Sequence, residues 1–433
     1  MPEKIYDVVG IGIGPFNLSL ACLLQPIKGV DSVFLDSSAG FNWHPGMMLE
    51  SAHLQTPFLS DLVTLADPTS PFSFLNYLKE QGRIYAFYIR ENFFLLRSEY
   101  NQYCQWAVAK LDNVVFNSHV QQVDYHAGLG CYLIHSQCTQ TGQSRTYRAK
   151  ALVLGTGTVP YTPPCCANLA AAVHSSQYLN VKVDLQRQAS ITVLGSGQSA
   201  AEIYYDLLQD IDKYGYELSW ITRSARFFPL EYNKLTLEMT SPEYVDYFHG
   251  LPAGQRDRVI AGQHNLYKGI NGALINDIYD LLYAKSLNHA IRANLLTHSA
   301  LTAAAFDTTS GQFTLDFEHQ EQAASFRHHS AGLVLATGYH YRLPEFLAGI
   351  EQRIQWDGQG RFAVNRNYSI DPNGNELFVQ NVGLHSHGFT TPDLGMVCYR
   401  NACIIEAITG TAHYPIERRI AFQQFAVPEA TGI

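Results

Sequence analysis

The sequence lacks long apolar runs, and its cysteines lack the spacing of a metal or redox centre. Across 433 residues, no uninterrupted hydrophobic stretch approaches the roughly 18 residues that a membrane-spanning helix requires. The eight cysteines form no Cys-x-x-Cys pair and have no histidine at the spacing of a zinc site. A membrane-spanning protein is therefore not expected, and neither is a bound metal or a disulfide scaffold.

Positive charge is also scarce. Lys and Arg total 29 against 38 Asp and Glu, which gives a formal net charge of -9, and no basic run marks a surface for phosphate backbones. Nucleic acid is therefore not an expected partner. The first residues, Met1-Pro-Glu-Lys-Ile-Tyr, lack the charged and apolar regions of a signal peptide. We expect a reduced, cytoplasmic protein.

Hydrophobic residues, by contrast, are plentiful. They make up 46% of the chain while charged residues make up 15%, a composition that supplies large cores and excludes a disordered chain. The chain also exceeds the size at which a single hydrophobic core stops growing. Two or more folding units are expected.

A strand, a tight glycine turn and a helix occur twice along the chain. The first pattern covers residues 6–14 and continues into a helix-compatible segment from Asn17, and the second covers residues 191–202. Such a unit binds the pyrophosphate of a dinucleotide at the N-terminus of its helix. The strands are continuously apolar, as in a parallel sheet covered on both faces. The prediction is an α/β fold with two Rossmann-like dinucleotide-binding domains.

Two further apolar runs, residues 152–157 and 333–339, end in glycine loops and resemble crossings between domains. We therefore expect a discontinuous first domain made of residues 1–165 and 330–433, with a second domain of residues 185–300 inserted into it. Hydride from a nicotinamide must pass to an acceptor within reach, so one domain should hold a flavin and the other a nicotinamide.

The first turn has the features of a dinucleotide site. Gly10 and Gly12 stand where a tight turn and a close approach to pyrophosphate are needed, and Asp36 ends the next strand, where it can bind ribose hydroxyls. The third glycine of the motif is missing, because Pro15 occupies its position and Gly14 lies one residue early. A plain turn between strand and helix is the alternative interpretation.

The second turn contains Gly195 and Gly197 and runs into Gln198 and Ser199. The strand that follows its helix ends at Arg223 rather than at an acid. An arginine there can pair with the 2′-phosphate of NADPH, although an ordinary surface charge remains the alternative. We expect NADPH at this turn and the flavin at the first.

Six motifs lie in order along nearly the whole chain: Gly10-x-Gly-x-Gly-Pro-Phe-Asn-Leu18, Phe41-Asn-Trp-His-Pro-Gly-Met47, Phe58-Leu-Ser-Asp-Leu62, Pro71-Phe-Ser-Phe-Leu-Asn-Tyr77, Ala336-Thr-Gly-Tyr339 and His387-Gly388. They resemble the motifs of the microbial N-hydroxylating flavin monooxygenases of siderophore biosynthesis. The resemblance implies FAD, NADPH and O2, with hydroxylation of the terminal primary amine of lysine, ornithine or a decarboxylated diamine through a C4a-hydroperoxyflavin. It also implies a homo-oligomer, either a dimer or a tetramer.

The same resemblance implies flavin-site roles for Trp43, His44, Met47, Thr337 and Gly388. It places Gln55 beside the isoalloxazine and the substrate, and His387 in a late loop that closes over the flavin, so both are assigned to catalysis. Trp43 and Met47 equally suit a hydrophobic core, and His387 equally suits a hydrogen-bonded loop.

Two departures from the family pattern concern the substrate. Amino-acid hydroxylases of the family carry a lysine at the position of Ser60, where it binds the substrate carboxylate, and an asparagine at the position of Leu237. Loss of such a charge-assisted contact is worth about 1.5 to 3 kcal/mol. A substrate without a carboxylate explains both departures, so putrescine or cadaverine is expected. An alternative is that Lys234 or Lys268 has taken over carboxylate recognition.

The second ammonium of a diamine requires a carboxylate or an aromatic face. Glu238, Tyr267 and Asp393 are the candidates, since they lie in segments that match the family's substrate walls. The alternatives are a lysine N6- or ornithine N5-hydroxylase and, more distantly, a flavin disulfide reductase, for which only the adjacent Cys165 and Cys166 are available.

Overall fold

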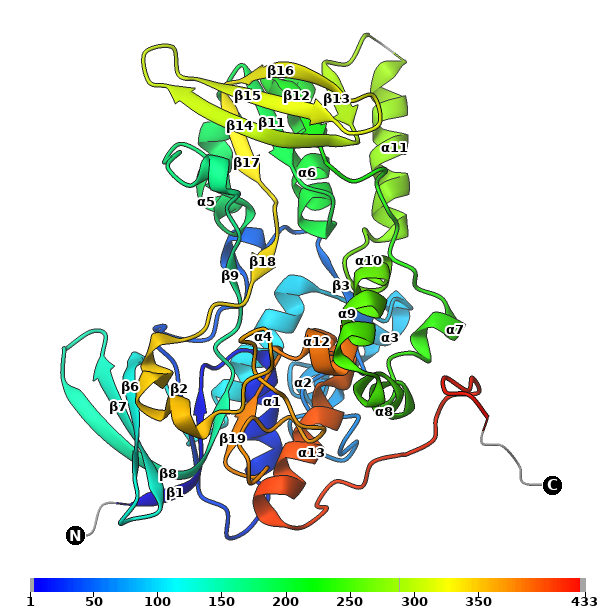
Figure 1. Ribbon diagram of the computed structural model, residues 1–433. Helices are drawn as coiled ribbons and strands as arrows, with labels where there is room; N and C mark the ends of the chain where they lie inside the picture. Colours follow the sequence, from blue (N-terminus) through cyan, green and yellow to red (C-terminus); the bar gives the residue numbers. More distant parts are fainter. Residues whose placement is uncertain (1–3, 288, 429–433) are drawn as a thin grey trace.

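The computed structural model describes residues 4–287 and 289–428, so the ends of the predicted first domain, 1–3 and 429–433, lie outside the described residues. Figure 1 shows two lobes, one above the other, which the chain joins through β9 (Val159–Pro160) and β18 (Tyr339–His340) on one side and through the segment between α10 (His264–Tyr267) and α11 (Gly272–Ser286) on the other. Each lobe is built on a parallel sheet, which confirms the predicted α/β fold with two Rossmann-like units.

The lower lobe contains a seven-stranded sheet in the order β5-β2-β1-β8-β7-β6, with β19 also paired to β8. Its strands are β1 (Ile5–Ile11), β2 (Ser32–Leu35), β5 (Val114–Val115), β6 (Ser118–His126), β7 (Cys131–Cys138), β8 (Ser144–Leu154) and β19 (Leu377–Val379). The central strands run parallel, with Val9 opposite Val33 and Leu152, and β6, β7 and β8 continue as an antiparallel meander. Apolar runs suit these strands because both faces of the sheet are covered.

The upper lobe contains a five-stranded parallel sheet in the order β10-β17-β11-β12-β13. These strands are β10 (Val173–His174), β11 (Ser190–Leu194), β12 (Glu217–Ile221), β13 (Ala293–Leu296) and β17 (Gly332–Leu335). A three-stranded antiparallel sheet covers one face: β14 (Ser299–Asp307), β15 (Gln312–His319) and β16 (Ala324–Ser330). A pair of short strands, β3 (His53–Pro57) and β4 (Phe94–Leu96), belongs to the segment between the lobes.

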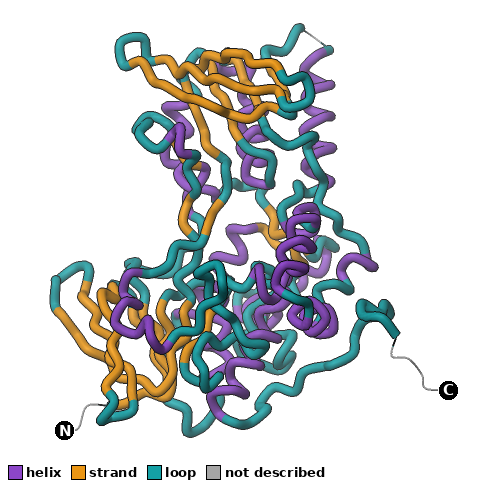
Figure 2. The backbone as a smooth tube through the Cα atoms, viewed as in Figure 1, coloured by secondary structure: helices purple, strands orange, loops and turns teal. Residues whose placement is uncertain are grey.

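Helices cover the sheets and fill the region between the lobes (Figure 2). They are α1 (Pro15–Leu24), α2 (Phe74–Glu80), α3 (Ile84–Arg90), α4 (Arg97–Val108), α5 (Tyr178–Leu185), α6 (Gln198–Tyr214), α7 (Lys234–Leu237), α8 (Pro242–Gly250), α9 (Ala253–Gly262), α10 (His264–Tyr267), α11 (Gly272–Ser286), α12 (Leu384–His387) and α13 (Val397–Thr409). α1, α4 and α13 pack on the lower sheet, and α5, α6 and α11 pack on the upper one. The 3-10 helices are η1 (Pro45–Met47), η2 (Pro164–Cys166), η3 (Ser175–Gln177), η4 (Glu345–Arg353), η5 (Gly388–Thr390) and η6 (Leu394–Met396).

One strand from the range predicted for the first domain belongs to the sheet of the upper lobe. β17 lies within the range we expected in the first domain, yet it pairs with β11 of the upper sheet over residues 332–335. The β14–β16 sheet also packs on the upper lobe, where Phe313 and Leu315 contact Leu194. We therefore propose that the β9 and β18 pair marks a boundary between the domains. The strands next to this pair along the chain, β10 and β17, belong to the upper sheet.

Candidate active site

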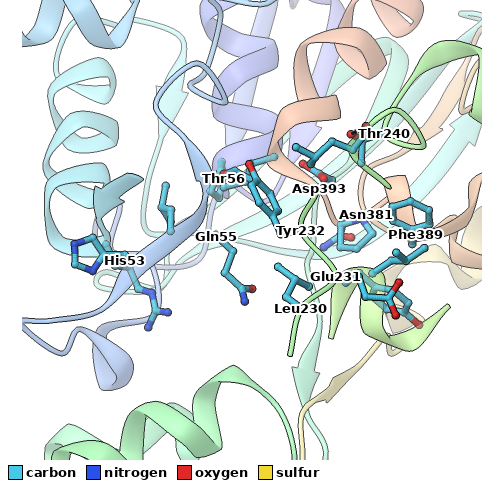
Figure 3. A pocket seen from close by; sticks show the side chains of 18 of the residues that line it. His53, Gln55, Thr56, Leu230, Glu231, Tyr232, Thr240, Asn381, Phe389 and Asp393 are labelled. Atoms are coloured by element: carbon cyan, nitrogen blue, oxygen red, sulfur yellow. Dashed lines mark hydrogen bonds between the residues drawn. The ribbon is translucent and has the colours of Figure 1, made fainter. Parts of the chain in front are cut away.

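A cavity of about 330 Å³ lies where the two lobes meet. Its walls come from four parts of the chain: the start of α1, the β3 region with Arg97, the segment from Leu230 to Tyr267, and the loop from Asn381 to Leu394. Figure 3 shows His53 on one side of the cavity and Asp393 on the other, with the amide of Gln55 pointing into the space between them. Residues far apart in the sequence thus share one chamber.

The first glycine turn fits a dinucleotide pyrophosphate at the N-terminus of α1. Gly14 is the N-cap of α1, and a side chain there would meet no atom within 4 Å, so the approach to the helix end is open. Gly12 has φ of +90°, and a Cβ there would lie 2.4 Å from the Gly155 carbonyl oxygen. Ile13 donates its backbone N–H to Asp36 Oδ2 over 2.7 Å, which fixes that carboxylate beside the turn.

Gly10 has a different role from the predicted one. A Cβ at Gly10 would lie 2.1 Å from the Phe34 ring, so this glycine makes room for packing between neighbouring strands. We propose that the close approach to pyrophosphate belongs to Gly12 and Gly14, because β1 ends at Ile11 and the open turn follows it.

The second glycine turn repeats this arrangement at α6. Gly197 is the N-cap of α6, and Gly195 has φ of +148° with the Ala336 carbonyl oxygen 2.1 Å from its Cβ position. Gln198 and Ser199 therefore form the first helical turn, at the end where an anion binds.

Positive charge gathers beside this second turn. Burial, together with the charge of Arg223, lowers the pKa of Lys268, and burial with the charges of Lys268 and Arg223 lowers the pKa of His264. These shifts mean that Arg223, His264 and Lys268 lie close together, and a bound phosphate would relieve the repulsion between their charges. Lys268 lies near Arg223 and does not line the cavity. Lys234, the other lysine considered for carboxylate recognition, is exposed and does not line it either.

A buried polar network crosses from one lobe to the other beneath the cavity. Arg97 at the start of α4 forms two hydrogen bonds with Glu202 of α6, over 2.8 and 3.0 Å, and their side chains are only 13% and 4% exposed. Gln198 Nε2 donates to Glu202 Oε1 over 3.0 Å, and its carbonyl oxygen accepts from Gln55 Nε2 over 3.3 Å. Gln55 also donates to the Gly269 carbonyl oxygen. The network holds the Gln55 side chain in its position at the cavity.

Sequence reasoning missed Arg97 and Glu202. The available signal was the spacing of Gln198 and Glu202, one helical turn apart, which puts both side chains on one face of α6. Nothing in the sequence marked Arg97 as their partner.

Trp43, His44 and Met47 divide between the cavity and the core. Trp43 and His44 line the cavity with their rings 4.9 Å apart, whereas Met47 is buried in the hydrophobic cluster of the upper lobe. The His44 side chain is exposed to the cavity, but the protein atoms around it desolvate the ring and, with the charge of Arg97, lower the pKa of His44 to about 4. His44 is therefore neutral at pH 7, and the core alternative holds for Met47.

His387 does not occupy the catalytic position that the resemblance implied. Its ring is fully buried, stacks on Tyr368 at 4.3 Å, and bonds through Nε2 to the Arg366 carbonyl oxygen and through Nδ1 to Ser386. Burial drives its pKa well below the usual value, so the ring is neutral. Both ring nitrogens of His387 are hydrogen-bonded, and the ring does not reach the cavity. His387 therefore positions the loop, in line with the alternative of a hydrogen-bonded loop histidine.

Gly388 and Thr337 also act through local structure. Gly388 has φ of +72°, and its Cβ position is 3.3 Å from the Phe248 ring, so a side chain there would disturb both the turn and the packing. Thr337 donates its hydroxyl to the Tyr161 carbonyl oxygen over 2.5 Å beside the β9 and β18 pair. Their cofactor-binding roles remain predictions.

Three of the five substrate candidates, Leu237, Tyr267 and Asp393, line the cavity. Ser60 is buried directly behind its wall, because Ser60 Oγ and Asp393 Oδ1 lie 3.3 and 3.1 Å from the Cβ position of Gly395. Glu238 is the exception. Its carboxylate accepts hydrogen bonds from the backbone of Phe422 and Gln423 outside the cavity, so its proposed contact with substrate is wrong.

Asp393 is one of the two acidic residues that line the cavity, and its pKa is raised. Burial raises the pKa of Asp393, against a hydrogen bond from the Gly395 N–H and the charge of Arg400. Glu231, Tyr232 and Thr240 line the same cavity and were missed, although they lie in a segment that we had marked around Leu237. Within the lining there are two carboxylates and no lysine.

Other classes of site find no support in the described parts of the chain. Over residues 4–287 and 289–428, no helix has the length and apolarity to cross a bilayer, and no group of His, Cys, Asp and Glu could hold a metal ion. Cys165 and Cys166 are unpaired and pack beside Leu194 under the β14–β16 sheet, away from the cavity. This position does not suit the thiol chemistry of a disulfide reductase.

Two dinucleotide turns around one chamber define the chain as a flavin- and nicotinamide-dependent oxidoreductase. Residues 4–341 match the family model described as L-lysine 6-monooxygenase/L-ornithine 5-monooxygenase, and the chain belongs to this family.

Individual relatives align over nearly the full chain. A putrescine N-hydroxylase of Shewanella oneidensis is 57% identical over 98% of this chain and 85% of its own length. A FAD-bound cadaverine monooxygenase of the desferrioxamine pathway from Erwinia amylovora is 58% identical, with a TM-score of 0.97 over 98% of this chain and 99% of that one. An ornithine N-hydroxylase of Kutzneria, solved with reduced FAD, NADP+ and L-ornithine, is 28% identical, with a TM-score of 0.86 over 94% and 99%.

Proposed function

We propose that this protein hydroxylates one terminal amine of an aliphatic diamine, putrescine or cadaverine, using FAD, NADPH and O2. The observation that carries the proposal is the lining of the cavity, which offers the carboxylates of Asp393 and Glu231 and no lysine for a substrate carboxylate, while its one arginine, Arg97, is already paired with Glu202. The relatives named for putrescine and cadaverine hydroxylation support the same substrate class. The product, an N-hydroxydiamine, is a building block for hydroxamate siderophores.

FAD and NADPH are the cofactors of this fold, and the residues of both turns fit them. The open helix N-terminus at Gly14 suits the pyrophosphate of FAD, with Asp36 beside it for the ribose. The helix N-terminus at Gly197 suits that of NADPH, with Arg223 and Lys268 available for the 2′-phosphate. When bound and reduced, the flavin would activate O2, so that one oxygen atom of O2 enters the hydroxyl group and the other leaves as water.

The chain's own groups favour a neutral amine at one side of the cavity. A free alkyl amine has a pKa of about 10.4, so at pH 7 in water very little of the amine is in the neutral form whose lone pair the reaction needs. His44 is neutral and Arg97 carries positive charge nearby, as the lowered pKa of His44 records. An ammonium beside them would be desolvated, and the Glu202 carboxylate is already paired with Arg97 and does not compensate it, which favours loss of its proton to water. Gln55 can accept a hydrogen bond from the bound amine through its side-chain oxygen, because both N–H groups of its amide are already used.

The opposite side favours the charged form of the second amine. Asp393 is half-buried, and desolvation raises the pKa of its carboxyl, against the charge of Arg400. A substrate ammonium at Asp393 would supply a positive partner, and Thr240 and Tyr232 could accept its remaining hydrogen bonds. The diamine would thus bind by its charged end and react at its neutral one.

The decisive experiment measures hydroxylamine formation by the FAD-loaded enzyme with NADPH and putrescine, cadaverine, ornithine and lysine offered separately. Hydroxylamine is measured together with NADPH loss, because NADPH can also be consumed in making H2O2. We expect product from the diamines. Product chiefly from ornithine or lysine would refute the substrate proposal and would mean that another group binds a carboxylate.

Two further statements are proposals of the same kind. We propose that the enzyme is a homodimer or homotetramer, since α3 exposes Tyr85, Tyr88 and Ile89 by 78, 72 and 74% and such a surface is typical of an interface. We also propose a cytoplasmic location, which suits its unpaired cysteines and its use of NADPH.

A further inference from the structure

The C-terminal strap, defined here as residues 414–425, runs from the end of α13 across the outside of α8 (Figure 1). Two carboxylates hold its backbone. Glu243 Oε1 accepts the N–H groups of Ile420 and Ala421 over 2.6 and 3.0 Å. Glu238 accepts those of Phe422 and Gln423, each over 3.0 Å.

The strap also binds the helix that precedes Glu238. The side-chain amide of Gln423 donates to the Leu235 carbonyl oxygen over 2.6 Å and to Glu238 Oε2 over 2.9 Å. The bonds to Glu238 and Leu235 join the strap to α7 and the residue after it, and the bonds to Glu243 join it to the first turn of α8. The clamp therefore fixes α7 from its outer side.

α7 needs such support. It is four residues long and has no buried residue, whereas helices shorter than roughly 12 residues are marginal in water without tertiary contacts. Its N-terminus is fixed by a capping box between Asn233 and Thr236, which satisfies local hydrogen bonds but does not attach the helix to the core. Thr236 and Leu237 nonetheless form part of the cavity wall.

A second contact of the strap supports the part of the cavity wall that contains Phe389. Phe425 packs edge-on against Tyr244 of α8 with ring centroids 5.2 Å apart, and Tyr244 contacts Phe389 at 5.6 Å. Phe389 lines the cavity, so one exposed segment supports two of its walls. Tyr414 anchors the start of the strap, because its hydroxyl donates to the Leu23 carbonyl oxygen over 2.7 Å.

We propose that Glu238 and Glu243 are positioning residues, which bind the C-terminal strap and thereby hold α7 in place as the wall against which the diamine chain packs. The inference rests on the proposed function, since it takes the cavity to be the diamine site. Because α7 forms part of the cavity wall and contains no residue of either glycine turn, the strap should affect diamine binding and leave NADPH binding and flavin reduction unchanged.

The test compares wild type, Glu238→Gln, a chain lacking residues 419–433, and Glu345→Gln as a matched control. Glu345 is an exposed acid that pairs with Arg342 away from the cavity. Glutamine at 238 turns one acceptor into a donor, which would face the N–H of Gln423 or Phe422. Amide hydrogen exchange, followed by mass spectrometry, should rise at residues 234–240 and 420–423 in Glu238→Gln and stay at the wild-type level in the control.

Kinetics supply the second readout. The KM for putrescine should rise about five- to tenfold in Glu238→Gln, the size of one ordinary hydrogen bond, because the Glu238 contacts are exposed and act on the wall rather than on the substrate. The truncated chain should show at least that rise, with unchanged KM for NADPH and unchanged flavin reduction in the absence of diamine. Faster exchange with an unchanged putrescine KM would overturn the inference, and so would unchanged exchange. If wild type makes no hydroxylamine from any diamine, the proposed function fails, while the exchange data still decide whether the strap holds α7.

Discussion

Replacing Ser60 with lysine tests the substrate proposal at a single position. Ser60 is 7% exposed, and its hydroxyl lies beside Asp393 across Gly395. A lysine there can extend its ammonium to the Asp393 carboxylate, because its stem is long enough to cross the glycine. The variant would carry its own cation in the place of the diamine ammonium.

The size of the effect follows from the contact that is lost. A hydrogen bond between charged groups is worth about 1.5 to 3 kcal/mol, which corresponds to a rise of about 10- to 100-fold in the KM for putrescine. Ser60→Met separates charge from bulk, since methionine has nearly the length of lysine without its ammonium. We expect a much smaller rise in that control. Asp393→Asn should remove most of the difference between the two variants, because the lysine then has no carboxylate to occupy.

The assay is hydroxylamine formation at varied putrescine concentration with saturating NADPH. Ornithine is assayed in parallel, because a lysine at 60 supplies the cation that a substrate carboxylate needs and should shift the ratio of the two kcat/KM values towards ornithine. Equal putrescine KM values for Ser60→Lys and Ser60→Met would refute the reasoning, since bulk alone would then explain the effect.

Three other perturbations test different parts of the site. Arg223→Ala should raise the KM for NADPH about tenfold and leave that for NADH unchanged, as measured by flavin reduction, because only NADPH carries the 2′-phosphate. Glu202→Ala leaves Arg97 buried without its partner and should lower the free energy of unfolding by about 3 kcal/mol in urea titrations of the holoenzyme. The KM for putrescine should rise as pH falls through the pKa of Asp393, which burial raises, because only the carboxylate binds ammonium. Asp393→Asn should abolish that pH dependence, whereas a dependence retained in the variant would assign it to another group.

The features that the sequence predicted well are those that depend on adjacent residues. A strand, a glycine turn and a helix form one local unit, so Gly12, Gly14, Gly195 and Gly197 could be placed without knowing what packs around them. Gly10 belongs to the same motif, yet its neighbour is Phe34 on another strand. A motif indicates that a glycine is needed there and does not say which contact requires it.

The features that the sequence did not predict depend on which way a side chain points. Leu237 and Glu238 are consecutive and were assigned to the same substrate wall, but neighbouring positions at the end of a helix point in different directions. Leu237 faces the cavity and Glu238 faces the strap. Arg97 and Glu202 lie 105 positions apart, and their pairing requires the two lobes to meet. His387 was marked by its motif, while its burial is set by Tyr368 and Arg366 from another loop.

The opposed character of the two sides of the cavity predicts that the proposed reaction stops at one hydroxyl group. A diamine must present a neutral nitrogen beside His44 and Gln55 and an ammonium to Asp393. Once one nitrogen is hydroxylated, it is far less basic than an alkyl amine, and only the other nitrogen remains an ammonium at pH 7. That remaining ammonium is the group that Asp393 binds, so a product that binds again places its hydroxylated nitrogen at the reactive side. The unreacted amine is therefore held away from the flavin by the same carboxylate that oriented the substrate.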